Sequence, residues 1–196
     1  MTPGILSQSF YARPTLTVAK DLLGMWLVRE VGGRRIEGRI VEVEAYVGPE
    51  DRASHASRGR TARTDVMFGP AGLAYIYLIY GMYHCFNVVT EREDYPAAVL
   101  VRAVELDGAA VGRRDRGGNR PRAALVDGPG RLCRTFQIDR SLNRADLTVG
   151  RGLWIEDRGD RFPRGRIGAH PRVGVDYAGE WAAKPWRFRV TGLDGR

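Results

Sequence analysis

The stretch "RIEGRIVEVEAYVG", residues Arg35–Gly48, decides the fold. From Val41 to Val47 every second residue is a small or branched apolar residue. Such alternation predicts a β-strand, whose successive side chains point to opposite faces of a sheet. The strand therefore has an apolar face and a face with two carboxylates. The apolar face carries Val41, Val43, Ala45 and Val47, and the opposite face carries Ile40, Glu42, Glu44 and Tyr46.

The two carboxylates admit two interpretations. Strands often show charged residues to solvent, whereas paired carboxylates in a pocket can act as general acid and base. Tyr46 follows Glu42 and Glu44 on the same face, and the next segment, "GPEDRASH", brings His55 close in sequence. This combination favours a pocket wall over an open sheet surface.

Residues Ala74–Val89, "AYIYLIYGMYHCFNVV", predict a β-hairpin with its turn at Gly81–Met82. Tyr75 and Tyr77 share one strand face and can be ordinary core aromatics. Tyr80 stands at the start of the turn, where there is little core to pack against. An apolar wedge in such a place can separate stacked bases.

Other elements follow from periodicity and from turn residues. A long loop over residues 48–74 and an arginine-rich surface excursion over residues 108–128 separate the predicted elements. These are a helix at Leu16–Val28, a strand at Ala98–Leu106, a short helix in "GRLCRTFQI", and strands in "GLWIED" and "WRFRVTG".

The charge points to a polyanionic partner. The chain has 196 residues and a formal net charge of +8, and of its 31 basic residues only Lys20 and Lys184 are lysine. Arginine's planar fork suits phosphate contacts, so nucleic acid is the first expected partner and an acidic membrane the second. Genomic base composition can also raise an arginine count, which leaves the charge argument short of a proof.

Length predicts one domain over residues 1–196, and the low cysteine count favours a reducing compartment such as the cytoplasm. Cys85 and Cys133 are too few for a disulfide framework, and no apolar run reaches the roughly 20 residues that span a bilayer. His84 beside Cys85 and the distant His170 give no set with metal-ligand spacing. We therefore expect no metal and no membrane association.

Five blocks, in order, carry a family pattern: "GRIVEVEAYVGPEDRASH", "MFGPAGLAYIYLIYGMYHCFNVV", "AVLVRAVE", "GPGRLCRTFQI" and "RVGVDYAGEWAAKPWRF". Together they resemble the alkyladenine (3-methyladenine) DNA glycosylases over residues 10–190. The resemblance implies a single α/β (α+β) domain with a curved, mainly antiparallel sheet, flanking helices and a protruding hairpin. It also implies a monomeric, monofunctional, cofactor-free DNA repair hydrolase. Such an enzyme acts on double-stranded DNA, flips out alkylated or deaminated purines and starts base excision repair by cutting the N-glycosidic bond.

The resemblance assigns catalytic roles to three residues. Glu44 is the general base that deprotonates a water, and Arg102 and the backbone carbonyl of Val173 help to hold that water. Glu42 lies on the same face without matching the catalytic position. It stays an alternative base if Glu44→Gln retains cleavage.

Further roles concern the flipped base and the DNA. Tyr46 and Tyr77 sandwich the base, His55 forms a hydrogen bond near it, and Asn87 discriminates against the exocyclic amino group of guanine. Tyr80 enters the duplex, while Met82 and Leu100 are apolar residues at the DNA contact.

Two other functions remain possible from the sequence. A catalytically silent, damage-binding DNA protein would keep the basic surface and the wedge without the chemistry. A nucleoside hydrolase would cleave free nucleosides, which fits poorly with a strongly basic chain and a protruding tyrosine.

Overall fold

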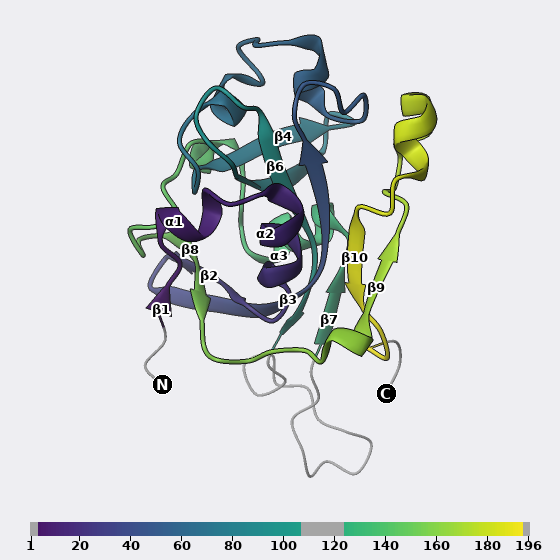
Figure 1. The fold of residues 1–196 in the computed structure, drawn as a ribbon. Helices are drawn as coiled ribbons and strands as arrows, with labels where there is room; N and C mark the ends of the chain where they lie inside the picture. Colours follow the sequence, from purple (N-terminus) through teal and green to yellow (C-terminus); the bar gives the residue numbers. More distant parts are fainter. Residues whose placement is uncertain (1–3, 107–123, 194–196) are drawn as a thin grey trace.

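The computed structural model of the chain describes residues 4–106 and 124–193. These residues fold into a curved antiparallel sheet with few helices (Figure 1). In the described residues the main strand order is β1-β8-β2-β3-β6-β5-β4. Strand β10 pairs with β3 and β9, and β7 pairs with β6. The strands are β1 (Gly4–Ile5), β2 (Trp26–Val31), β3 (Arg34–Val47), β4 (Ala74–Ile79), β5 (Tyr83–Val89), β6 (Ala97–Leu106), β7 (Ala124–Asp127), β8 (Leu153–Asp157), β9 (Ile167–His170) and β10 (Arg187–Val190). The predicted mixed α/β fold is confirmed.

Strand β3 is the long central strand that the alternating sequence predicts, and it is bordered on both edges. One edge pairs with β6, while the other pairs with β2 over residues 34–39 and with β10 over residues 42–44. The register with β6 is irregular between Ile40 and Val43. Glu42 and Glu44 are both buried, so the solvent-facing interpretation of these two carboxylates is wrong.

Helices pack against the sheet through small apolar faces and close the main core. Helix α2 (Thr15–Leu22) contacts β3 and β6, and α3 (Pro129–Thr135) contacts β5, β6 and β7. Val18 and Leu22 of α2 and Leu132 of α3 belong to the same buried cluster. The remaining helical elements are α1 (Gln8–Tyr11) and the short 3-10 helices η1 (His55–Arg58), η2 (Asp65–Phe68), η3 (Arg140–Leu142), η4 (Arg164–Arg166) and η5 (Asp176–Ala183).

The predicted helix over residues 16–28 is wrong in its second half. Helix α2 ends at Leu22, and β2 begins at Trp26. Gly24 between them has φ of 97°, a left-handed conformation that favours glycine, and a Cβ there would lie 2.6 Å from the Asp160 carbonyl oxygen. Apolar spacing suited a helix, but this glycine turns the chain into the sheet.

The arginine-rich excursion predicted over residues 108–128 is shorter than expected at its end. Residues 124–127 form β7, which pairs with β6. Most of the excursion, residues 107–123, lies outside the described residues. The predicted strands at Ala98–Leu106, in "GLWIED" and in "WRFRVTG" are confirmed within two residues. The short helix predicted in "GRLCRTFQI" is confirmed as α3, which ends at Thr135, three residues earlier than that stretch.

The predicted hairpin is formed by β4 and β5, but its turn is centred on Tyr80–Gly81, one residue before the predicted Gly81–Met82, and has an unusual backbone. The amide of Met82 donates to the Ile79 carbonyl at 3.2 Å, and the two central residues, Tyr80 and Gly81, have φ of 52° and 69°. Two positive φ values are typical of the tight turns that suit strand twist, but a tyrosine there is uncommon. Tyr80 is 81% exposed and Met82 65% exposed, so the tip projects two apolar side chains into solvent.

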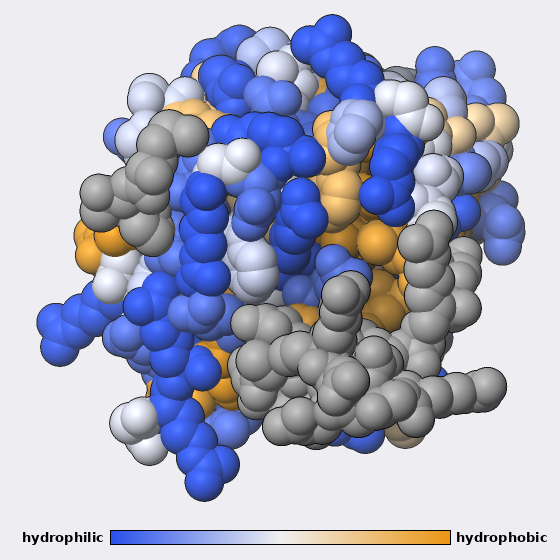
Figure 2. Space-filling view, turned by 90° about the horizontal axis from the view of Figure 1, so that it is seen from below, coloured by the Kyte–Doolittle hydropathy of each residue, from blue (hydrophilic) through white to orange (hydrophobic). Residues whose placement is uncertain are grey.

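The surface seen from below is mainly hydrophilic, with hydrophobic side chains in limited areas (Figure 2). No helix in the described part of the chain is long and apolar enough to cross a membrane.

Candidate functional site

A cavity of about 120 Å³ lies where β3, β4, β5 and β6 meet the loops around His55 and Val173. Eight of the ten residues assigned to the site from the sequence line this cavity. Tyr80 and Met82 are the other two, and they lie at the exposed hairpin tip. The eight are Glu44, Tyr46, His55, Tyr77, Asn87, Leu100, Arg102 and Val173.

Strand register explains why distant residues meet at the cavity. Tyr75 pairs with Asn87, Asn87 with Leu100, and Leu100 with Glu44. Directly paired residues of antiparallel strands point to the same face. One row across four strands therefore supplies a phenol, an amide, an apolar side chain and a carboxylate to one wall.

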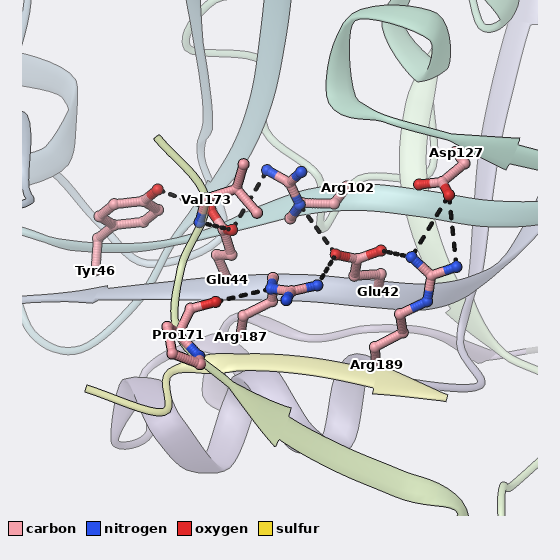
Figure 3. A network of polar contacts seen from close by, with 9 residues as sticks. All are labelled: Glu42, Glu44, Tyr46, Arg102, Asp127, Pro171, Val173, Arg187 and Arg189. Atoms are coloured by element: carbon pink, nitrogen blue, oxygen red, sulfur yellow. Dashed lines mark hydrogen bonds and ion pairs between the residues drawn. The ribbon is translucent and has the colours of Figure 1, made fainter. Parts of the chain in front are cut away.

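Glu44 is fully buried and accepts three contacts on its two carboxylate oxygens (Figure 3). Oε1 lies 3.3 Å from Nη1 of Arg102 and 2.8 Å from the backbone nitrogen of Val173, which donates to it. Oε2 accepts a 2.8 Å hydrogen bond from the Tyr46 hydroxyl. Val173 thus contacts Glu44 through its amide, whereas the family resemblance implied a role for its carbonyl.

Burial and neighbouring donors act in opposite directions on Glu44. Burial raises the pKa of Glu44 above its ordinary value, while Arg102, the Val173 amide and the Tyr46 hydroxyl lower that pKa. Burial also raises the pKa of Tyr46 well above the usual range, so its hydroxyl keeps a proton to donate. The carboxylate is consequently desolvated yet hydrogen-bonded, which is a suitable state for a general base.

Glu42 has a different set of partners, all of them arginines (Figure 3). Its Oε1 lies 3.1 Å from Arg102 and 3.1 Å from Arg187, and its Oε2 lies 3.0 Å from Arg189. Glu42 does not line the cavity. The carboxylate of Glu42 therefore anchors Arg102, whose guanidinium bridges Glu42 and Glu44.

Aromatic rings form a second part of the cavity lining. The rings of His55 and Tyr77 are 4.6 Å apart and nearly perpendicular, and Tyr75 and Tyr77 are 5.3 Å apart. Nδ1 of His55 lies 3.0 Å from the Tyr75 hydroxyl. Burial and the cations of Arg63 and Arg58 lower the pKa of His55 to about 4, so this imidazole is neutral near pH 7.

Asn87 and Leu100 lie deep in the wall. The Asn87 amide nitrogen donates to the Tyr75 carbonyl at 3.0 Å, which fixes the orientation of the side chain. Leu100 is only 3% exposed, unlike Met82. Of the two residues predicted at the DNA contact, Met82 is on the outer surface and Leu100 faces the cavity.

Sequence reasoning missed two ionic groups next to this site. One is the pair of β10 arginines on Glu42, and the other is Arg172, which forms a bidentate pair with Asp51. These partners are more than 100 residues apart in the chain. No local pattern could have joined them, although "DRASH" and "HPRVG" each contain one member of the second pair.

Known proteins are similar to this chain over nearly its whole length. The family described as Methylpurine-DNA glycosylase (MPG) matches residues 9–194. A protein of Methanocella arvoryzae is 52% identical over 94% of this chain and 91% of its own length, and one of Myxococcus xanthus is 53% identical over 94% and 89%. A protein of Legionella pneumophila is 46% identical over 94% and 93%. Each bears the name "Putative 3-methyladenine DNA glycosylase".

The family match covers all the elements that build the cavity, from β3 to the loop at Val173. The chain therefore belongs to the methylpurine-DNA glycosylase family.

Proposed function

We propose that the cavity receives an alkylated purine flipped out of duplex DNA and that Glu44 directs its hydrolytic removal. Family membership makes the chain a DNA N-glycosylase of base excision repair. One observation carries the assignment of the site: a fully buried carboxylate faces a cavity and holds three donors on its two oxygens. A protein that only bound DNA would have no need of a buried carboxylate beside a polyanion.

The aromatic walls suit a damaged purine. Alkylation at a ring nitrogen gives the base a positive charge, and such a cation is attracted to the faces of tyrosine rings by roughly 0.5 to 2 kcal/mol. Tyr46 and Tyr77 are the two rings that would enclose it. The neutral state of His55 supports this role, because an imidazolium would repel a cationic base.

Hydrolysis requires a water between the base and Glu44. The carboxylate takes a proton from this water while the oxygen of the water attacks the anomeric carbon. The purine leaves with the electron pair of the glycosidic bond. Arg102 and the Val173 carbonyl are proposed to hold the water. The negative charge of Glu44 also stabilises the oxocarbenium-like transition state.

The hairpin tip supplies the wedge. Tyr80 would enter the duplex and occupy the space of the extruded nucleotide, with Met82 beside it. Asn87 and Leu100 would contact the flipped nucleotide inside the cavity. The Asn87 amide, held by the Tyr75 carbonyl, would exclude the exocyclic amino group of guanine.

A monofunctional reaction is proposed because the described amines lie elsewhere. Lys20 is near the ring of Phe188, and Lys184 is near the rings of Trp181 and Trp186. Neither lysine lines the cavity. Backbone nicking by a Schiff base would need such an amine, so borohydride treatment should trap no covalent adduct with DNA. We also infer that the chain folds as one domain and acts as a monomer.

The decisive experiment measures release of free base from methylated and from hypoxanthine-containing duplex DNA under single-turnover conditions. Wild type should release base, and Glu44→Gln should lose release while it still binds the duplex. Glu42→Gln is the matched carboxylate variant. Retained cleavage by Glu44→Gln would reject Glu44 as the base, and binding without release by wild type would favour the silent DNA-binding protein.

A further inference from the structure

A fully buried ion pair lies behind the cavity wall and has no role in the reaction described above. Nη1 and Nη2 of Arg172 lie 2.5 and 2.8 Å from the two carboxylate oxygens of Asp51, and neither side chain has exposed surface. Neither residue lines the cavity. Burying two charges carries a large desolvation cost, so a buried pair is poor evidence of stabilisation and calls for another explanation.

The pair joins three backbone segments that carry cavity residues. Arg172 donates to the carbonyl of Ala45, which lies between Glu44 and Tyr46, and directly precedes Val173. Asp51 accepts hydrogen bonds at 3.1 Å from the amides of Val47 and Ala53. The end of β3, the segment leading to His55 and the loop at Val173 are therefore held by one ionic contact.

The same guanidinium lies against the ring of Tyr46. Its central carbon is 4.9 Å from the centroid of that ring. Tyr46 lines the cavity and Arg172 does not, so the guanidinium contacts the ring from outside the cavity lining. A second ring, that of Trp186, lies 5.1 Å from the guanidinium.

A cation behind an aromatic ring opposes a second cation on the other face. The attraction of a cationic base to Tyr46 comes from the negative face of the ring, and an uncompensated positive charge nearby would cancel part of it. The carboxylate of Asp51 lies at hydrogen-bond distance from the Arg172 guanidinium and compensates its positive charge. With Asp51 present, the group behind the ring is neutral as a whole.

We propose that Asp51 and Arg172 are positioning residues that set substrate preference: Arg172 orients Tyr46 and Val173, and Asp51 neutralises Arg172 so that Tyr46 can accept a cationic alkylated purine. The inference rests on the proposed function, because it concerns the base that the cavity receives. It predicts a role that depends on the charge of the substrate, which a purely structural ion pair would not have.

The test compares single-turnover release of cationic 7-methylguanine and of uncharged hypoxanthine from otherwise identical duplexes. Asp51→Asn leaves Arg172 uncompensated, so the ratio of the two rates should fall by about fivefold, within the range expected of a cation–π contact. Asp51→Glu keeps the charge and should keep the ratio near that of wild type. The ratio of rates does not depend on the fraction of protein that is folded.

A matched control lies at another arginine on an aromatic ring. Arg158 lies 4.4 Å from the Trp26 ring and pairs with Glu37 at 2.8 Å, away from the cavity, so Glu37→Gln should leave the ratio unchanged. Equal losses for both substrates in Asp51→Asn, or the same ratio in Asp51→Asn and Asp51→Glu, would overturn the proposal. Absence of release by wild type would instead reject the proposed function.

Discussion

The hydroxyl of Tyr46 donates a 2.8 Å hydrogen bond to Oε2 of Glu44, two residues earlier on the same strand face. The ring that we propose to enclose the base thus also lowers the pKa of the Glu44 carboxylate through its hydroxyl. Tyr46→Phe keeps the ring and removes this bond. Because the bond lowers the pKa of Glu44, its loss should raise that pKa further. In the proposed reaction base release needs the ionised carboxylate, so the acid limb of the pH–rate profile should move to higher pH.

Tyr177→Phe is the control for this change. Tyr177 also lines the cavity, but its hydroxyl donates to the Ala53 carbonyl at 3.3 Å. Its pH–rate profile should match that of wild type. An unshifted acid limb in Tyr46→Phe would show that Glu44 is not the group whose ionisation limits the rate.

Glu44 should reduce stability at neutral pH, as expected for a buried group devoted to function. Burial raises its pKa in the folded state, so folding favours the neutral form. Stability from this group is then fully present below the unfolded pKa of about 4.3 and is lost as pH rises through the folded pKa. Relative to wild type, Glu44→Gln should therefore gain free energy of unfolding between pH 4 and pH 7. Urea unfolding at several pH values measures this, and a constant difference would contradict it.

Unlike Glu44→Gln, Glu42→Gln should lower stability strongly and base release only weakly. Its loss leaves three arginines close together without their shared carboxylate, so unfolding free energy should fall by about 3 kcal/mol. Single-turnover base release by the folded fraction should fall far less than in Glu44→Gln. Glu37→Gln, at a more exposed carboxylate, should cost about 1 kcal/mol or less. A complete loss of release in Glu42→Gln alone would make Glu42 the base.

The backbone of Tyr80 predicts that its side chain is kept for DNA rather than for folding. Asparagine tolerates positive φ better than tyrosine, so Tyr80→Asn should be as stable as wild type or more stable by up to about 1 kcal/mol. Release from duplex DNA should nevertheless fall at least tenfold, because base flipping loses its wedge. Tyr80→Phe keeps the ring and should keep activity. A stable Tyr80→Asn with normal duplex activity would reject the wedge.

His55 should titrate well below the usual range. Nuclear magnetic resonance of the labelled imidazole should give a pKa of about 4, owing to burial and to the cations of Arg63 and Arg58. Arg63→Gln should raise this pKa. Because His55 is neutral above about pH 5, it should contribute no limb to the pH–rate profile between pH 6 and pH 8. A measured value near 6.5 would contradict the packing described here.

Local pattern was enough to predict the strands that carry the chemistry. The alternation around Glu42 and Glu44 identifies β3, and glycine and exposed apolar residues identify the tip at Tyr80. The helix expected over residues 16–28 was partly wrong because Trp26 keeps helical spacing with Leu22, although Gly24 turns the backbone between them. The spacing of apolar residues does not reveal that one residue, Gly24, adopts a left-handed conformation.

Ionic partners were not predictable, since they depend on how distant strands pair. Arg187 reaches Glu42 across 145 positions because β10 lies beside β3. The Asp51–Arg172 pair spans 121 positions and involves loops. A single sequence rich in arginine offers many equivalent candidates for each carboxylate, and only the folded chain selects among them.

The double border of β3 has a consequence for amide hydrogen exchange. Residues 42–44 are flanked by β6 on one edge and β10 on the other, so their amides should open only with the most stable cooperative unit of the molecule. The amides of Gly81 and its neighbours at the hairpin tip should exchange rapidly through local fluctuations. Partial opening that frees the tip would thus leave the carboxylate of Glu44 in place, ready before any DNA arrives.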